Sequence, residues 1–114
     1  MIYVASPYTN SDPRVMQERY EAVAKFCAEK FLKGNLVFSP IAHWHPIAFL
    51  YSLPKDADWW RQLDEEYLIN STDLWVLELV GWRKSKGVKR EIAFAMKNKI
   101  RINHFKKGGE NCNV

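Results

Sequence analysis

The chain has 114 residues, of which 47% are hydrophobic and 14% aromatic, and its formal net charge is +4. This length suits one compact domain with its own core and excludes a second, so we expect a single domain at residues 1–107 and a flexible tail at residues 108–114. The apolar stretches are far shorter than the roughly 20 residues that cross a bilayer, and no apolar signal segment follows the start, so we expect a cytoplasmic protein without a membrane partner. Cys27 and Cys112 lack metal-ligand spacing, which favours a reducing compartment.

Two short strands and one helix are predicted in the first 40 residues. Residues 1–6 form an apolar run of β-forming residues closed by a proline, which is typical of a buried strand. Asp12 and Pro13 are the residue types favoured at an N-cap and at the first helical position, and Gly34 is a typical helix stop. Residues 35–40 repeat the strand pattern, so this second strand should lie parallel to the first after a helical crossover.

The rest of the chain continues the alternation of helices and strands. Residues 41–54 are rich in aromatic residues and histidine and have no clean period, so we expect an irregular loop with about two helical turns. Downstream, the expected elements are a helix from Asp56 or Asp58 to about Ser71, a strong strand at residues 73–80, a helix at residues 87–98 and a last strand at residues 100–105.

Four strands separated by helices predict an α/β fold. The expected architecture is a three-layer, flavodoxin- or Rossmann-like parallel sheet of four to five strands with helices on both faces. Ligands of such sheets bind at the carboxyl ends of the strands. The loops in which to search for a site are therefore residues 6–12, 39–54 and 80–87.

The positive charge is concentrated between residues 83 and 107, where Lys and Arg recur. Such a patch attracts anions, although a solvated helix face is the commoner explanation of a Lys/Arg run. The tryptophans are not interleaved with the lysines in any recognised RNA-binding signature. A nucleic acid is therefore the less favoured partner.

The turn from Gly81 to Gly87 leads from the strongest strand into a helix. It brings backbone N–H groups, the positive end of the helix and the hydroxyl of Ser85 to a place where an anion could bind. Neither the GxxxxGK[ST] nor the GxGxxG order is present, so spacing alone favours an ordinary helix start with Ser85 as its N-cap. Glu91 lies one turn into this helix, where the helix dipole stabilises a glutamate with or without chemistry. A functional role for Glu91 therefore requires a partner.

The preceding helix offers an acid as that partner. Asp64 falls inside the face defined at helical spacing by Trp60, Leu63, Tyr67 and Ser71, whereas Glu65 and Glu66 fall outside it. An acid on an inward face costs free energy unless it is paired, which makes Asp64 the candidate.

Three further side chains come from the first strand and the aromatic segment. Tyr3 lies in a buried strand, where its hydroxyl needs one partner. His43 and His45 stand at alternate positions without a third ligand nearby, so we expect no metal and interpret them, with Trp44, as the lining of an aromatic pocket.

Three segments together resemble the nucleoside 2-deoxyribosyltransferase superfamily. They are residues 2–8, an acid-bearing helix that leads into residues 73–77, and residues 85–95. The last segment resembles that of the 2′-deoxynucleoside 5′-phosphate N-hydrolases, in which a serine and a glycine precede the nucleophilic glutamate. A short branch of uncharacterised phage and bacterial proteins, with SPY, SPI.H and GW..S.GV..E signatures, looks closer still.

The resemblance implies an enzyme that cleaves the N-glycosidic bond of a (deoxy)nucleoside or nucleoside 5′-monophosphate through a glutamyl-glycosyl intermediate, as a hydrolase or a base-exchange transferase without a cofactor. It implies Glu91 as the nucleophile and Tyr3 as the tyrosine that hydrogen-bonds near it. For the second acid, an ungapped count back from the third strand points to Glu65, whereas helical phase points to Asp64, which we prefer.

The same resemblance implies the rest of the site and the assembly. Ser85 takes the place of a phosphate-contacting serine, and the other expected substrate-binding residues are Ser6, Tyr8, His43 and Gly87. The glycine-rich loop of the N-hydrolases is replaced here by residues 6–9, which alters the phosphate contact at that point. A homodimer or larger homo-oligomer is implied as well. The alternative is a non-catalytic protein that binds nucleotides or nucleic acid.

Overall fold

A parallel sheet of four strands lies at the centre of the fold. The computed structural model describes residues 1–112, and residues 113 and 114 of the expected tail lie outside the described residues. The strands follow one another across the sheet in the order β2-β1-β3-β4. Their bounds are β1 (Ile2–Ala5), β2 (Val37–Phe38), β3 (Asp73–Leu77) and β4 (Arg101–Phe105).

This strand order places a reversal of the winding between β1 and β3. The two strands are paired in parallel, with Ile2 opposite Asp73 and Ala5 opposite Val76. The order equals the first four strands of the flavodoxin-like arrangement, whose ligands bind where the winding reverses. The expected three-layer α/β fold is therefore confirmed, with four strands, and its topology directs attention to the carboxyl ends of β1 and β3.

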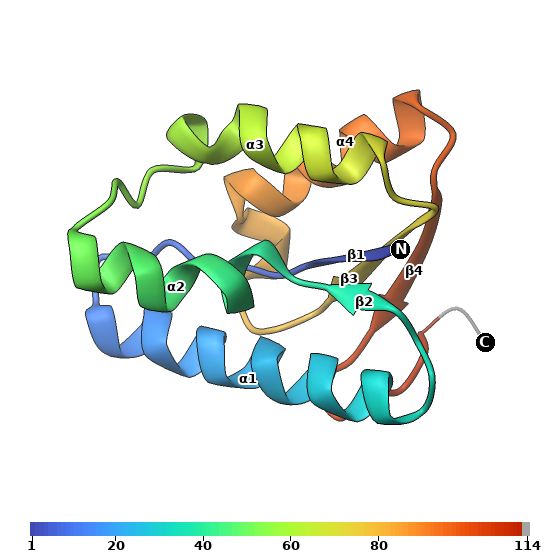
Figure 1. Ribbon diagram of the computed structural model, residues 1–114, viewed down its shortest axis with the longest axis horizontal. Coiled ribbons are helices and arrows are strands. Elements are labelled where there is room, and N and C mark those ends of the chain that lie inside the picture. The colour runs from blue at the N-terminus through green and yellow to red at the C-terminus, as the bar shows by residue number, and fades with distance from the viewer. Residues whose placement is uncertain (113–114) are drawn as a thin grey trace.

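One face of the sheet is covered by α1 (Pro13–Leu32), which lies below the strands in Figure 1. The helix begins as predicted: the side chain of Asp12 accepts a hydrogen bond from the Arg14 N–H at 2.9 Å, and Pro13 stands in the first turn. Gly34, at a φ of +94°, follows its end. The helix buries Val23 and Phe26 against the sheet, together with Val4, Leu77 and Phe105.

The opposite face is covered by α3 (Ala57–Ile69) and α4 (Lys86–Lys97), which lie above the strands in Figure 1. Leu68 of α3 and Val88 and Ala95 of α4 are fully buried, in one cluster with Tyr3, Leu74 and Val76 of the sheet. The short 3₁₀ helix η1 (Trp82–Lys84) precedes α4. This packing determines which face of α3 and of α4 is turned towards the end of β1.

The segment expected to be an irregular loop is instead the twelve-residue helix α2 (Pro40–Tyr51), which lies beside α1 in Figure 1. Like α1, it begins with a capping residue followed by proline. Ser39 Oγ accepts a hydrogen bond from the Ala42 N–H at 3.1 Å, and Pro40 occupies the first turn. Because apolar residues occur all around the helix, the sequence shows no helical period there. This early start takes Ser39 and Pro40 out of the expected second strand, which ends at Phe38.

The end of the described chain returns towards β4. The Cys112 N–H donates to the carbonyl of His104 at 2.7 Å, and Phe105 and Asn111 form an antiparallel bridge. Both cysteines are free. Within residues 1–112, no helix combines the length and the apolar character that crossing a membrane requires.

Candidate active site

A cavity of about 540 Å³ opens at the carboxyl ends of β1 and β3, in the place that the topology indicates. Its wall is built by the loop after β1, by one face of α2, by the segment that enters α3 and by the start of α4. The expected site residues that line it are Tyr3, Ser6, Tyr8, Asp64, Ser85, Gly87 and Glu91. Residues from four distant parts of the sequence therefore meet at one surface.

His43 does not lie in this wall. Its side chain is exposed and packs against Phe38 and Trp44, with ring centroids 5.9 and 5.0 Å away, and His45 lines the cavity in its place. The reason is the helical course of α2, which puts residues at spacings of three and four on one face. The residues of α2 that share the face with His45 and line the cavity are Ile41, Trp44, Ala48 and Phe49. If the sequence had predicted this helix, the same spacing would have indicated His45, rather than His43, as the histidine of the cavity wall.

Two loops at the mouth of the site are held together by Arg19 of α1. Its guanidinium donates to the carbonyls of Tyr8 and Thr9 after β1, at 3.3 and 3.2 Å, and to the carbonyl of Val80 after β3, at 3.2 Å. Gly81 makes this close approach feasible, because a Cβ there would stand 2.9 Å from the Arg19 Nη2 and its φ is +91°. The loops that carry the site thus have a fixed relative position.

A tyrosine and two carboxyl groups form the polar centre of the cavity. The Tyr3 hydroxyl, fully buried in β1, donates a hydrogen bond to Glu91 Oε2 of α4. Asp64 reaches the same wall from α3, and its buried Oδ1 has no hydrogen-bond partner among the described residues. Asp64 therefore lies on the inward face, as helical phase predicts, while Glu65 pairs with Arg61 at 3.4 Å.

Both carboxyl groups bind their protons more tightly than usual. Burial and, secondarily, the charge of Asp64 raise the pKa of Glu91 to about 8, against a smaller opposing effect of the Tyr3 hydrogen bond. Burial, followed by the charge of Glu65, raises the pKa of Asp64 to about 7. Burial and the charge of Glu91 also raise the pKa of Tyr3, which therefore remains a donor. Because the carboxyl groups are coupled, they titrate as a pair and share protons near neutral pH.

The start of α4 presents hydrogen-bond donors to the cavity. Ser85 is its N-cap, as predicted, and its Oγ accepts from the Val88 N–H at 3.2 Å, which leaves the hydroxyl hydrogen free to donate elsewhere. The N–H groups of Lys86 and Gly87 precede the first hydrogen bond within the helix, from Lys89 N to Ser85 O. This end of the cavity therefore favours a negatively charged group.

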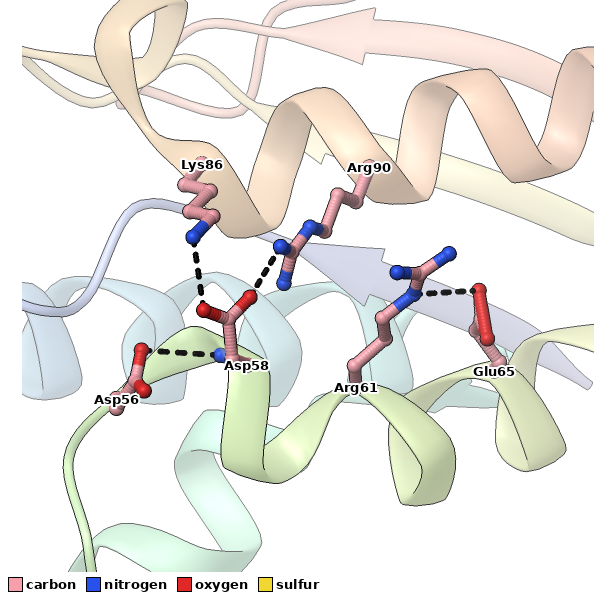
Figure 2. Close-up of polar contacts among 6 residues, drawn as sticks. All are labelled: Asp56, Asp58, Arg61, Glu65, Lys86 and Arg90. Carbon is pink, nitrogen blue, oxygen red and sulfur yellow. Dashed lines mark hydrogen bonds and ion pairs between the residues drawn. The ribbon is translucent and has the colours of Figure 1, made fainter.

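Two basic side chains of α4, those of Lys86 and Arg90, form ion pairs with an acid of α3. Figure 2 shows Asp58 between Lys86 and Arg90: Lys86 Nζ donates to Asp58 Oδ2 at 2.8 Å, and Arg90 pairs with Oδ1. Arg83 lies over the ring of Trp82, 5.1 Å from its centroid, and does not line the cavity, whereas Lys84 and Lys86 do. The positive field at the site therefore comes from these lysines and the helix end.

Aromatic side chains cover the remaining wall. Trp44 of α2 and Trp60 of α3 face one another with ring centroids 5.5 Å apart, and the Trp60 N–H is already bonded to the carbonyl of Pro54 at 2.7 Å. The buried Trp44 N–H has no partner among the described residues. Flat apolar surfaces beside a few polar groups are typical of small-molecule sites. No group of three or more His, Cys, Asp or Glu within residues 1–112 is arranged to hold a metal ion.

Comparison with known proteins gives a family for the chain. Residues 1–107 match the model of a domain of unknown function, DUF1937. No curated protein matches the sequence. Because the match spans almost the whole chain and includes every residue of the cavity described above, the protein belongs to the DUF1937 family.

Proposed function

We propose that the protein cleaves the N-glycosidic bond of a (deoxy)nucleoside or nucleoside 5′-monophosphate, with Glu91 as the nucleophile. The observation that carries the proposal is the environment of the Glu91 carboxyl group. It accepts a hydrogen bond from a buried tyrosine hydroxyl, and the charge of a second acid, Asp64, helps to raise its pKa. Both acids lie in the wall of a cavity where the winding of the sheet reverses. Perturbed acids of this kind in a cleft are typical of catalytic sites. The resemblance of three sequence segments to the nucleoside 2-deoxyribosyltransferase superfamily supports the same roles.

In the proposed reaction, ionised Glu91 attacks the anomeric carbon, and the bond from that carbon to the base nitrogen breaks with its electron pair on the base. The proton that the leaving base requires comes from Asp64, in the singly protonated form of the pair that has its proton on Asp64. This reactive form is the minor one, because the pKa of Glu91, about 8, is higher than that of Asp64, about 7. Water then attacks the glycosyl ester, while the Asp64 carboxylate accepts its proton. A second base in place of water would give a new nucleoside.

Tyr3 has a supporting role in this scheme. Its hydroxyl donates to one carboxylate oxygen of Glu91 and fixes the orientation of the other. The raised pKa of Tyr3, caused mainly by burial, keeps the hydroxyl protonated throughout the cycle. Tyr3 therefore positions the nucleophile and stabilises its anionic form.

A 5′-phosphate fits the donor-rich start of α4. Ser85 retains a free hydroxyl hydrogen, the first N–H groups of the helix are available, and Lys84 and Lys86 line the same wall. We propose the 5′-monophosphate as the preferred form of the substrate on this basis, with Trp44 and Trp60 beside the base.

A second copy of the chain is the proposed partner. The side chains of Phe49, Leu50 and Tyr51 at the end of α2 are 80%, 71% and 75% exposed, and Phe49 also belongs to the cavity wall. Large exposed apolar side chains in one patch are a feature of interaction surfaces. A homodimer that covers this patch would complete the wall of the cavity.

The experiment that tests the proposed function is incubation with a panel of nucleosides and their 5′-monophosphates, followed by chromatography for released base. Asp64→Asn should lower base release by about 10²-fold or more, because a general acid contributes about that factor. Glu65→Gln is the matched control on the next residue of α3 and should retain activity within about threefold of wild type, a change too small to indicate loss of an acid catalyst. The reverse result would assign the second acid to Glu65.

If no member of the panel releases its base, the alternative function, a non-catalytic binding protein, gains support. A protein that neutralises several backbone phosphates binds oligonucleotides with an affinity that falls steeply with salt, whereas a monophosphate site needs no polymer. Tight oligonucleotide binding at physiological salt, without cleavage of any nucleotide, would therefore contradict the proposal.

A further inference from the structure

Beside the acids, the cavity contains a second polar chain that the proposed reaction does not use. The Tyr8 hydroxyl lies 2.6 Å from His45 Nδ1, and His45 Nε2 lies 2.9 Å from Gln17 Oε1. All three residues line the cavity, although they come from the loop after β1, from α2 and from α1. The ring of Tyr20 stacks on His45, with centroids 4.3 Å apart and planes 21° from parallel. The imidazole is thus fixed on both nitrogens and on one face.

The direction of these hydrogen bonds follows from the groups at their ends. The structure places the side-chain oxygen of Gln17, which accepts, against His45 Nε2, and with this placement Nε2 carries the hydrogen of the bond. Burial lowers the pKa of His45, so the ring is neutral near pH 7 and holds only one hydrogen. Its Nδ1 is therefore an acceptor. Because burial also raises the pKa of Tyr8, the phenol keeps its hydrogen and donates it to Nδ1.

In this arrangement the Tyr8 oxygen can only accept a hydrogen bond from a group in the cavity, because its hydrogen is already donated to His45. Two side chains of the same wall, those of Thr9 and Asp56, also present acceptors. The Thr9 hydroxyl already donates to the carbonyl of Lys55 at 2.7 Å, and the carboxylate of Asp56 has no hydrogen to give. In contrast, the Ser6 hydroxyl and the Trp44 N–H, which have no partner among the described residues, are donors in the cavity lining. Lys55 also lines the cavity, and its ammonium is a donor on an exposed side chain.

Two parts of the cavity wall therefore differ in their hydrogen-bonding groups. The start of α4 presents donors, from Ser85 and the free N–H groups, whereas the wall made by Tyr8, Thr9 and Asp56 presents acceptors. A ligand that matches both has an anionic group at one end and hydrogen-bond donors at the other. Among nucleoside monophosphates, bases with an exocyclic amino group have such donors, and their oxo counterparts place an acceptor in the same position.

We infer that Tyr8, oriented by His45 and Gln17, selects an amino-substituted base, of the adenine or cytosine class, over its oxo counterpart. Tyr8 contacts the base, and His45 and Gln17 are positioning residues that act through the direction of the Tyr8 hydroxyl. This inference rests on the proposed function for the location of a nucleotide in the cavity. It adds the chemical class of the base and a role for His45, the histidine that lines the cavity.

The tautomer of His45 gives a test that requires no ligand. Nitrogen-detected NMR of the imidazoles distinguishes a ring with its hydrogen on Nε2 from one with its hydrogen on Nδ1, and the signal of His45 is identified by its loss in His45→Asn. We expect the neutral ring with the hydrogen on Nε2. A hydrogen on Nδ1 would mean that the Tyr8 oxygen accepts from the histidine and would overturn the inference.

Selectivity itself is measured by titration calorimetry on the Glu91→Gln protein, so that binding is separated from cleavage. The ligands are the 5′-monophosphates of 2′-deoxyadenosine and 2′-deoxyinosine, and of 2′-deoxycytidine and 2′-deoxyuridine. We expect the amino member of at least one pair to bind about tenfold more tightly, since a site built to accept a hydrogen bond rejects a ligand that lacks the donor. Affinities within about twofold in both pairs would overturn the inference and leave the proposed function intact.

Substitutions then connect the preference to the polar chain. Tyr8→Phe should reduce the preference for the amino member to about twofold or less, because the acceptor oxygen is gone. His45→Leu should reduce it at least as far, because the freed Tyr8 hydroxyl can then donate to an oxo group. His45→Asn should retain it, because its side-chain oxygen can replace Nδ1 as the acceptor. A preference that persists in Tyr8→Phe would contradict the inference, and a failure of all four ligands to bind would contradict the proposed function as well.

Discussion

The two acids of the cavity make the stability of the protein depend on pH. Burial raises the pKa of Glu91 to about 8 and that of Asp64 to about 7, both above the ordinary values of such groups. The folded state therefore holds protons that the unfolded state has already released between about pH 4 and pH 8. The contribution of protonation to stability is complete below about pH 4 and is lost as the pH rises through the raised pKa values.

We therefore predict that the free energy of unfolding falls from about pH 5 to about pH 8, by on the order of 6 kcal/mol for the pair. Glu91→Gln should remove much of this slope and stabilise the protein at the upper end of the range, because a neutral amide can still accept from Tyr3. Urea denaturation at several pH values measures the effect. Glu66→Gln, at an exposed position of α3, is the control and should leave the slope unchanged. A slope that is the same in Glu91→Gln would show that Glu91 is not the group responsible.

Ser85 combines a structural role and a proposed binding role, which substitutions can separate. Ser85→Ala removes the N-cap and the proposed phosphate donor, whereas Ser85→Gly keeps most of the capping preference and Ser85→Thr keeps the hydroxyl. Because a hydrogen bond to a charged group is worth about 1.5–3 kcal/mol, Ser85→Ala and Ser85→Gly should lower kcat/KM for the monophosphate by roughly ten- to a hundredfold.

The comparison that decides this prediction is with the unphosphorylated nucleoside. Its kcat/KM should hardly change in Ser85→Gly, because the lost donor has no partner in that complex, and Ser85→Thr should behave as wild type with both substrates. Equal kcat/KM for a nucleoside and its monophosphate in the unsubstituted protein would rule out the phosphate contact.

At the scale of secondary structure, the helix starts were predictable wherever a capping residue preceded an amphipathic stretch. Asp12, Asp56 and Ser85 are candidate caps from residue type alone, and all three accept the expected hydrogen bonds. The start of α2 carries the same signal in Ser39 and Pro40, but residues 41–51 have apolar side chains on every side of the helix. Periodicity therefore does not reveal this helix, nor the face that contributes His45 to the cavity.

Ser39 gives a prediction for this element. Its hydroxyl accepts from the Ala42 N–H at 3.1 Å and caps a helix that forms one wall of the cavity. Ser39→Ala should lower the free energy of unfolding by about 1 kcal/mol, the typical value of a serine N-cap. Ser52→Ala, at the exposed other end of α2, is the matched control in urea denaturation. Equal stability of the two variants would contradict the capping role of Ser39.

At the scale of the whole molecule, the layers and the parallel sheet followed from the alternation of strands and helices. The same reasoning predicted the edge of the sheet at which the cavity opens. Helical phase correctly turned Asp64 towards that edge. Partners such as Tyr8 and His45 were not predictable, because their contact depends on how α2 packs against α1 and the loop after β1, and no local pattern in the sequence encodes this packing.

The most direct test of Glu91 as the nucleophile is base release by the Glu91→Gln variant. The substrate is the one that the nucleotide panel identifies. The glutamine side chain would keep the shape of the glutamate and its hydrogen bond from Tyr3, but its amide cannot form the glycosyl ester. We predict that kcat falls by at least about a thousandfold while the protein stays folded and still binds the nucleotide. Release within about tenfold of the unsubstituted protein would show that Glu91 is not the nucleophile, because the loss of a covalent catalyst costs far more.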